Sequence, residues 1–328
     1  MDTAKQNLRI QKAVAVVSVL LLAAKFFAYY LTRSVSILTD ALESIVNVTA
    51  GLIGLYSLYI SAKPRDKDHP YGHGKAEFIS AAIEGTMIGA AGTIILYKAV
   101  QHLINPVELK SIDYGIILVA ATAVVNYIMG YLCLRTGKKN NSAALVASGQ
   151  HLQTDTFSTV GIIAGLALLY FTNYWWIDSA VAILFGAYIV YNGYRIIRSS
   201  IAGIMDEADI KLLNRMVQAL NKNRGENWVD LHNFRVIKYG SVLHVDCHFT
   251  VPWYLNVHEA HREIDALTEL IRKEFGEAIE LFVHSDGCLP FSCRICDKKN
   301  CAERKNNFEQ RINWTLENIS RNKKHELT

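Results

Sequence analysis

Six long apolar stretches dominate the first 200 positions of the chain. They cover residues 13–31, 36–60, 79–104, 115–134, 142–171 and 175–197. The hydrocarbon core of a bilayer is about 30 Å thick, and a helix needs roughly 20 apolar residues to cross it. A soluble protein that buried six such helices in so short a segment would have little polar surface left to cover them. The sequence therefore predicts a membrane protein with an all-α bundle of six transmembrane helices.

Basic residues are concentrated in alternate connections between these stretches. They occur in the N-terminal arm, after the second and fourth stretches, and at the end of the sixth, whereas the opposite loops hold few. Basic loops stay on the cytoplasmic side, so both termini are expected there, in a plasma (inner) membrane surrounded by lipid. The first stretch has no small-residue cleavage site and is interpreted as a retained span. The net charge of +4 reflects this asymmetry and gives no reason to expect a nucleic-acid partner.

The composition changes to mixed charge after about residue 204. Helical spacing and alternation then predict an α-β-β-α-β order, with elements at residues 206–223, 233–238, 241–251, 257–275 and 279–284. This order suggests a small α+β domain, of ferredoxin-like type, with its helices on one face of a short sheet. We therefore divide the chain into a transmembrane domain (residues 1–203), a cytoplasmic α+β domain (204–287) and a Cys-rich extension with a basic tail (288–328).

Ionisable side chains lie inside two of the predicted spans. Asp40, Glu43 and Asn47 share one helical face in the second span, and His151 and Asp155 share another in the fifth. Each charged residue costs about 2.5 to 3.5 kcal/mol to insert, so such residues usually face the bundle interior and mark function. Polar residues that only hold helices together are the alternative. Two matched faces favour an ion site with carboxylate, imidazole and amide ligands.

Four cysteines follow the predicted domain in the spacing C-x4-C-x2-C-x4-C: Cys288, Cys293, Cys296 and Cys301. On the predicted cytoplasmic side the compartment is reducing, which favours metal binding over disulfides. Four thiolates suit a structural zinc ion, and an iron–sulfur cluster or free, redox-active thiols are the alternatives.

Three segments resemble the cation diffusion facilitator family. They read SVSILTDALESIVNVTAG, DKDHPYGHGKAE and HLQTD, and the resemblance runs from about residue 10 to residue 287. The family holds its transported ion in a quartet from the second and fifth spans. His151 and Asp155 match that pattern, but Glu43 and Asn47 stand where the family has His or Asp followed by Asp. Asp40, one turn earlier, is a possible substitute ligand.

The resemblance also implies metal sites outside the spans. Asp66, His69 and His73 match a loop site that some members carry, although loop residues of this kind are often only solvated and Asp68 could compete as a ligand. In the cytoplasmic domain the corresponding residues are His232, His248, His261, His284 and Asp286. Alternation along residues 241–251 places His248 on the polar face with His244 and Asp246.

The resemblance further implies a homodimer whose cytoplasmic domains meet, and an ion pair between Lys75 and Asp206. The expected function is export of divalent transition-metal ions, and no enzymatic activity is expected. Zinc is favoured, with iron or cobalt possible. Metal binding needs a neutral His151 and ionised carboxylates, so it displaces protons, and exchange of metal for protons by alternating access follows.

Two alternative functions remain open from the sequence. A membrane-anchored metal sensor or regulator with a degenerate transport site is favoured by the neutral Asn47. A redox-linked membrane protein would use the four cysteines.

Overall fold

The computed structural model describes residues 2–32, 35–104, 113–172, 176–240 and 242–327. Within these ranges it leaves out the side chains at positions 2, 28–29, 31–32, 35–43, 46–47, 98, 102, 113–119, 158, 162–172, 176–179 and 181. The chain forms two compact units that divide between Met205 and Asp206, close to the predicted boundary at residue 203.

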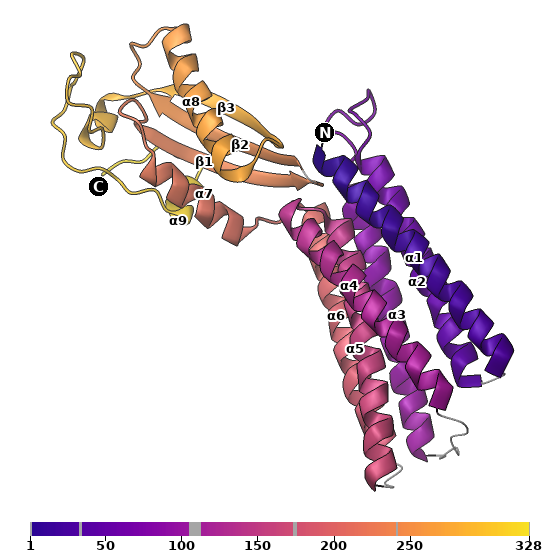
Figure 1. The fold of residues 1–328 in the computed structure, drawn as a ribbon. Helices are drawn as coiled ribbons and strands as arrows, with labels where there is room; N and C mark the ends of the chain where they lie inside the picture. Colours follow the sequence, from indigo (N-terminus) through magenta and orange to yellow (C-terminus); the bar gives the residue numbers. More distant parts are fainter. Residues whose placement is uncertain (1, 33–34, 105–112, 173–175, 241, 328) are drawn as a thin grey trace. The chain divides into compact units, whose positions relative to one another are not determined.

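The first unit is made of six long helices, shown in indigo to rose in Figure 1. They are α1 (Asp2–Thr32), α2 (Val35–Ser61), α3 (Ala76–Ile104), α4 (Asp113–Lys139), α5 (Ala143–Thr172) and α6 (Trp176–Ile204). The shortest has 27 residues, which at about 1.5 Å per residue exceeds the hydrocarbon thickness. The six predicted helices are therefore present. Within the described residues, Thr3–Phe27 and Ala76–Gln101 satisfy a combined test of length and hydropathy for membrane spans.

Close helix packing in this unit depends on small residues. α3 lies against α6, α4 against α5, and α1 against α2. At the α3–α6 contact a Cβ on Gly193 would lie only 2.7 Å from the backbone nitrogen of Gly89. In lipid, the hydrophobic effect does not drive helices together. Small residues stabilise their association by letting the helix backbones approach closely.

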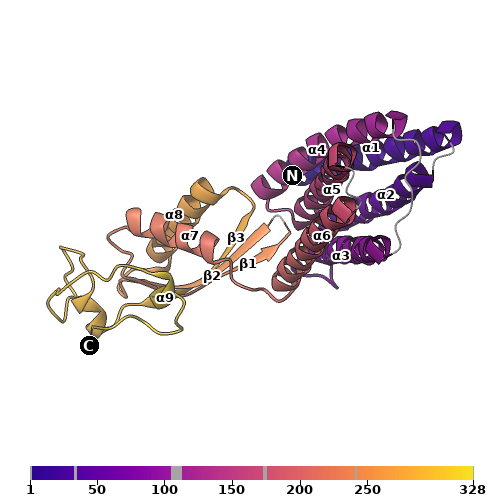
Figure 2. The same cartoon turned by 90° about the horizontal axis from the view of Figure 1, so that it is seen from below.

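The second unit contains a three-stranded sheet with helices α7 (Ile210–Lys222) and α8 (Val257–Phe275) on one face (Figures 1 and 2). The strands are β1 (Asp230–Tyr239), β2 (Val242–Val251) and β3 (Ile279–Gly287), in the spatial order β1-β2-β3. β1 runs antiparallel to β2, and β3 runs parallel to it after the α8 crossover. The predicted α-β-β-α-β order is confirmed, and it corresponds to the last five elements of the ferredoxin-like order β-α-β-β-α-β.

A bulge in β1 makes that strand longer than predicted. The strand begins at Asp230 instead of residue 233, and its register with β2 shifts between His232 and Arg235. Asn233 lies at the bulge with φ of +52°, a left-handed conformation that Asn tolerates better than most residues. The extra residue at the bulge interrupts the alternation of apolar and polar residues. A prediction based on that alternation therefore misses the first part of the strand.

The core of the second unit lies between the sheet and its helices. Leu243, Val245, Cys247 and Phe249 of β2 are buried there with residues of α7 and α8. His244, Asp246 and His248 alternate with them and face the other side, as predicted. This second face of the sheet is therefore available for polar chemistry.

The C-terminal extension has little regular structure but is packed onto the second unit. It contains only the short helices η1 (Pro290–Arg294) and α9 (Leu316–Ile319) within its described part. Trp314 and Ile319 are buried in the core, and the Arg224 guanidinium lies 4.1 Å from the Trp314 ring centroid. The extension is thus part of the folded unit.

A testable stability contribution comes from Asp209, which caps α7. Its carboxylate accepts hydrogen bonds from the Leu212 backbone (3.0 Å) and the Lys238 ammonium (2.6 Å). Burial alone would raise the pKa of Asp209, but these two hydrogen bonds lower it below its ordinary value. A carboxyl with a depressed folded pKa stabilises the fold above its unfolded pKa and loses this contribution as pH falls through the folded value.

We therefore expect Asp209→Ala to lower the free energy of unfolding by about 1 kcal/mol at pH 7, the usual cost of a lost N-cap. The difference from wild type should shrink as the pH falls toward 3. The measurement is the denaturant midpoint of the full-length chain in detergent at pH 7 and at pH 3. Unfolding is monitored by tryptophan fluorescence. Asp265→Ala, at an exposed position of α8, is the control. An equal loss at both pH values would contradict the assignment.

Candidate metal centres

The first candidate centre lies on α5. His151 and Asp155 are one turn apart, and their Nε2 and Oδ2 atoms are 4.0 Å from each other. The His151 side chain is buried, whereas the Asp155 side chain is 28% exposed. α2 contacts α5, as a quartet shared by the two helices requires. The side chains of Asp40, Glu43 and Asn47 on α2 lie outside the described residues.

A second group of buried polar side chains, missed in the sequence, lies one turn from His151. The hydroxyl of Ser148 donates to the carboxylate of Glu84 at 3.1 Å and accepts from Gln11 Nε2 at 3.1 Å. Glu84 and Gln11 are completely buried. The three residues therefore join α1, α3 and α5 by polar contacts inside the bundle. A carboxylate in an apolar stretch was the available signal for Glu84.

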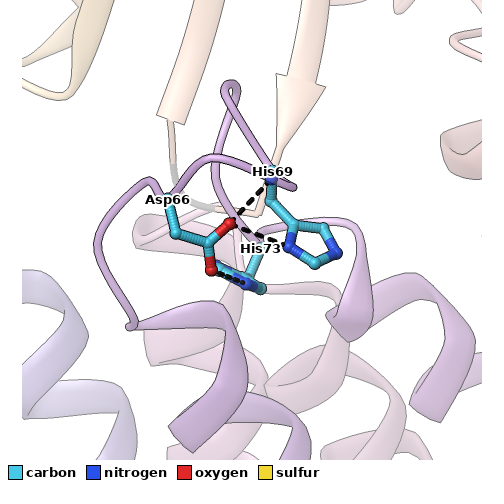
Figure 3. Close-up of side chains that lie close together, drawn as sticks. All are labelled: Asp66, His69 and His73. Carbon is cyan, nitrogen blue, oxygen red and sulfur yellow. Dashed lines mark hydrogen bonds and ion pairs between the residues drawn. The ribbon is translucent and has the colours of Figure 1, made fainter.

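Asp66, His69 and His73 meet in the loop between α2 and α3 (Figure 3). His69 Nδ1 lies 3.1 Å from Asp66 Oδ1, and His73 Nε2 lies 3.3 Å from Asp66 Oδ2. The backbone N–H of His69 also donates to Asp66 and holds the pKa of that carboxyl below its ordinary value. Tetrahedral ligands about 2.0–2.1 Å from a zinc ion lie about 3.4 Å from one another. The spacing of this loop group therefore suits a small divalent cation.

Two neighbouring residues of the loop have other roles. Asp68, the possible competing ligand, is outside this three-residue group, and its backbone N–H donates to Asp66. Lys75 donates to the backbone carbonyl of Ile204 at the end of α6 (3.3 Å). The predicted pair of Lys75 with Asp206 joins residues of both units and stays a prediction.

In the second unit, three histidines form a row across the sheet. The strand register places His232 opposite His248, and His248 opposite His284. The ring centroids of the two neighbouring pairs are 5.0 and 4.6 Å apart. The row lies on the face of the sheet turned away from α7 and α8, and the bulge at Asn233 lets His232 share that face with His248.

Asp286 completes this row. One of its carboxylate oxygens, Oδ2, lies 3.6 Å from His232 Nε2 and 3.5 Å from His248 Nδ1. The other oxygen lies 3.7 Å from His284 Nε2. These separations are again those of atoms that surround a tetrahedral ion. His232, His248 and Asp286 thus form the second group of three close ligand atoms in the described part of the chain.

His261 lies apart from this group within the second unit. It is on α8, where its Nε2 atom is 3.7 Å from Asp265, and both side chains are about two-thirds exposed. The structure therefore brings together four of the five predicted cytoplasmic ligands and leaves His261 on the helix surface.

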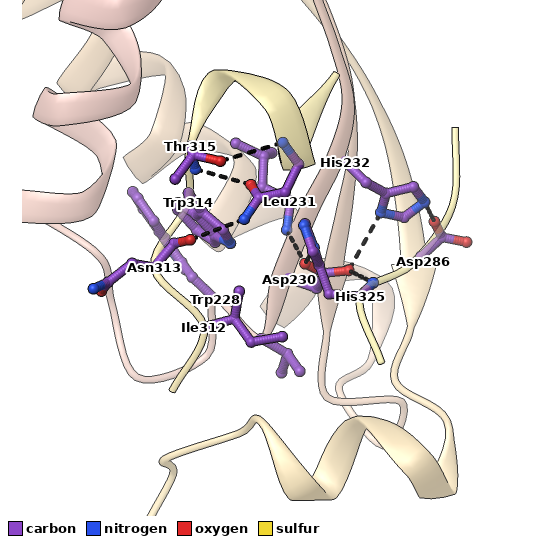
Figure 4. Close-up of polar contacts among 12 residues, drawn as sticks. Trp228, Asp230, Leu231, His232, Asp286, Ile312, Asn313, Trp314, Thr315 and His325 are labelled. Atoms are coloured by element: carbon purple, nitrogen blue, oxygen red, sulfur yellow. Dashed lines mark hydrogen bonds and ion pairs between the residues drawn. The ribbon is translucent and has the colours of Figure 1, made fainter. Parts of the chain in front are cut away.

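The electrostatics around the row suit a metal ligand set. Burial, with the neighbouring imidazoles of His232 and His284, lowers the pKa of His248 below its ordinary value, which favours the neutral form that binds metals. Behind His232, Asp230 Oδ2 lies 3.5 Å from Nδ1 (Figure 4). A carboxylate in this position orients the imidazole so that Nε2 points at the ion. Burial alone would raise the pKa of Asp230, but hydrogen bonds from His232 and His325 lower it.

The end of the extension reaches this same site, a contact for which no local sequence pattern is a signal. The backbone N–H and the Nδ1 atom of His325 both contact the Asp230 carboxylate (Figure 4). The ammonium of Lys324 lies 3.4 Å from Asp286 and donates to the Gly287 carbonyl at 3.0 Å. The tail thus adds two basic side chains beside the carboxylates of the ligand group.

The four cysteines of the extension gather around one cavity of about 140 Å³, together with Trp253 and Tyr254. All four are free thiols. Burial raises the pKa of the Cys288 and Cys296 thiols, whereas a reactive cysteine needs a lowered pKa. The prediction that these thiols bind metal or are redox-active stays a prediction.

Both units of the chain match domains of a known protein family. The cation efflux transmembrane domain matches residues 12–205, and the cytoplasmic domain of cation efflux proteins matches residues 210–288. The segment beyond Cys288, with Cys293, Cys296 and Cys301, lies outside both matches. An uncharacterized transporter of Synechocystis is 32% identical over 247 residues, which are 75% of this chain and 80% of that protein.

Cation-efflux pumps called FieF are also similar. The pump of Cronobacter sakazakii is 27% identical over 84% of this chain and 91% of its own length. The pump of Shewanella oneidensis is 24% identical over 84% of this chain and 92% of its own length. Both domain matches, in the order and at the positions of the two structural units, agree with the resemblance found in the sequence. The chain is an integral membrane protein that belongs to the cation diffusion facilitator family of cation-efflux transporters.

Proposed function

We propose that this protein exports a divalent transition-metal ion from the cytoplasm in exchange for protons. The observation that carries the proposal is the pair His151 and Asp155, a buried and a partly buried side chain one turn apart on α5 within a cation efflux transmembrane domain. Glu43 and Asn47 of α2, with Asp40 as a possible substitute, supply the remaining ligands of the proposed quartet.

The exchange follows from the chemistry of the ligands. A metal ion binds neutral imidazole and ionised carboxylate, so its arrival displaces protons from His151 and Asp155. Protonation of the same groups from the other side of the membrane then favours release. Alternating access of the site to the two sides couples the two flows.

Zinc is the proposed cargo, and iron(II) and cobalt(II) are the nearest competitors. A site of mixed nitrogen and oxygen ligands accepts all three ions. The neutral amide of Asn47 reduces the charge of the quartet relative to the family pattern. Position 47 is therefore the residue at which we expect the choice of metal to be made.

The proposed arrangement has α1–α6 all crossing the membrane and both termini in the cytoplasm. The basic loops support this orientation, and the bacterial FieF relatives support an inner-membrane location. The match to the cytoplasmic domain of cation efflux proteins supports a homodimer that meets through the second unit. We classify that unit as a ferredoxin-like variant.

The test is metal flux into proteoliposomes with a pH indicator inside. We expect zinc to enter inside-out protein-containing vesicles and the internal pH to rise as protons leave. Vesicles without protein are the control. Zinc binding without flux would instead support the alternative function, a metal sensor with a degenerate transport site, which Asn47 favours.

We further propose that His232, His248, His284 and Asp286 bind a metal ion that regulates transport. The position of Lys324 supports this assignment. Its ammonium lies beside Asp286, where it can compensate the carboxylate charge in place of a metal ion. The tail residue would then compete with the metal ion for Asp286.

Lys324→Ala is accordingly expected to strengthen metal binding at the cytoplasmic site by several-fold, since a partly exposed ion pair contributes at most about 1 kcal/mol. Zinc affinity would be measured by calorimetry on a chain that also carries Asp66→Ala and Asp155→Ala, which remove the loop and transport sites. The four cysteines would keep the metal with which the protein is purified. Lys323→Ala removes the same charge from an exposed neighbour and should have little effect. Weaker binding after Lys324→Ala would show that the tail supports the site instead of competing with it.

A further inference from the structure

The four cysteines converge although they come from a segment with almost no regular structure. Cys288 directly follows β3, Cys293 lies in η1, and Cys296 and Cys301 lie in the loop after it. All four line the same cavity of about 140 Å³. Metal transport by the proposed quartet makes no use of them, and the three cysteines after Cys288 lie outside the matched family domains.

Two of the four sulfur atoms have a hydrogen-bond donor. The backbone N–H of Lys305 lies 3.4 Å from Cys293 Sγ, and the Tyr254 hydroxyl lies 3.7 Å from Cys301 Sγ. Sulfur is a weak acceptor as a thiol and a much better one as a thiolate. The donors to Cys293 and Cys301 are outer contacts of the kind that orient thiolate ligands.

The charge around the cavity also suits bound thiolates. Lys298, Arg304 and Lys305 line it, against one acid, Glu303. The Arg304 guanidinium donates to the backbone carbonyls of Cys293 (2.9 Å) and Cys296 (3.0 Å), and so holds two of the ligand-bearing turns together. A zinc ion with four thiolates carries about two negative charges, which this excess of basic residues offsets.

We propose that Cys288, Cys293, Cys296 and Cys301 bind a thiolate-ligated metal centre that ties the extension to the sheet. Its ligands are distinct from the nitrogen and oxygen ligands of the transport and regulatory sites. The centre joins the end of β3 to the extension, whose later residues fill the core with Trp314 and bring Lys324 to Asp286. A segment with so little regular structure gains most from such a staple.

A single zinc ion and an iron–sulfur cluster share this thiolate chemistry but differ in size. Thiolates about 2.3 Å from zinc lie about 3.8 Å from one another. In the described residues, the groups of three ligand atoms within 4.8 Å of one another are the two His and Asp groups, and neither contains a cysteine. A wider spacing of the four cysteine sulfurs favours an iron–sulfur cluster, because its inorganic core keeps the cysteines apart. Binding of a single zinc ion would require the loop with Cys296 and Cys301 to move closer to the other two cysteines.

The experiment uses full-length protein purified without oxygen. Metal analysis and the visible absorption spectrum distinguish the two forms: a colourless protein with tightly held zinc, or a coloured protein with iron and acid-labile sulfide. After the bound metal is removed from the colourless form, cobalt(II) should restore an intense thiolate-to-cobalt charge-transfer band. The His and Asp sites cannot produce this band. Either form should also protect the four thiols from a maleimide reagent.

The proposal is overturned if the purified protein holds neither metal, shows no charge-transfer band with cobalt and leaves all four thiols equally reactive before and after chelation. Cys301→Ser should remove the band, and Cys301→His, which keeps a ligand, should retain a shifted one even if the serine variant folds poorly. Cys133→Ser, in α4, is the control and should change neither signal. Zinc flux does not enter these measurements, so failure of the transport proposal would leave their result unaffected.

Discussion

Asp155→Ala should reduce zinc flux into proteoliposomes to the level of protein-free vesicles. Asp155 supplies the only carboxylate on the described face of α5, one turn from His151 (4.0 Å). Without it the imidazole remains, but the site loses negative charge that offsets the cost of moving a divalent ion away from water. The helix itself should persist, because alanine favours helices more than aspartate does.

The matched control for this variant is Asp265→Ala. His261 and Asp265 have the same His-x-x-x-Asp spacing, but both side chains are about two-thirds exposed on α8. Flux should be unchanged in the control, which would show that burial in the bundle and not the spacing carries the function. Zinc binding at the cytoplasmic site should survive in both variants and verifies folding. Wild-type flux in Asp155→Ala would exclude the proposed quartet.

The same quartet predicts that Asn47→Asp shifts the ratio of zinc to iron(II) and cobalt(II) flux. An added carboxylate raises the charge of the site and replaces a weak neutral ligand by a strong one. The measurement is competition between the ions in the same vesicles. An unchanged ratio would remove position 47 from the control of selectivity.

The sequence predicted the helices and the order of the second unit because both follow from local periodicity. The apolar stretches correspond to α1–α6, and alternation identified β2 with its polar face. The start of β1 was wrong by three residues, because the bulge at Asn233 interrupts the alternation. Local patterns fail where one inserted residue changes which face a side chain occupies.

The candidate sites were harder to predict because they depend on distant pairings. The histidines of the sheet could be named from the family resemblance, but their alignment in one row follows from the strand register, which the sequence leaves open. The tail contact of Lys324 with Asp286 joins residues 38 positions apart through irregular chain. Within the bundle, Ser148 of α5 contacts Glu84 of α3. Predicting this contact would have required the rotation of both helices about their axes, which the sequence does not specify.

Asp286→Asn should weaken metal binding at the cytoplasmic site by on the order of a hundredfold or more. Asp286 is the residue that touches the whole row, at 3.5 to 3.7 Å from His232, His248 and His284. Loss of an outer partner alone costs metal sites about 10- to 100-fold in affinity, so replacing a direct carboxylate ligand by a weak neutral amide should cost at least as much. Asparagine has nearly the same shape, which isolates the effect of the charge.

Zinc affinity would again be measured by calorimetry on a chain carrying Asp66→Ala and Asp155→Ala, with the four cysteines keeping the metal with which the protein is purified. Asp246→Asn is the matched control, since Asp246 lies on the same face of the sheet, opposite Arg235, and outside the ligand group. Equal affinities for Asp286→Asn and the unmodified background would remove Asp286 from the ligand set. The variant also separates the roles of the tail: if Lys324 acts only by competing for the Asp286 carboxylate, then Lys324→Ala should strengthen binding in the parent and have no effect in Asp286→Asn.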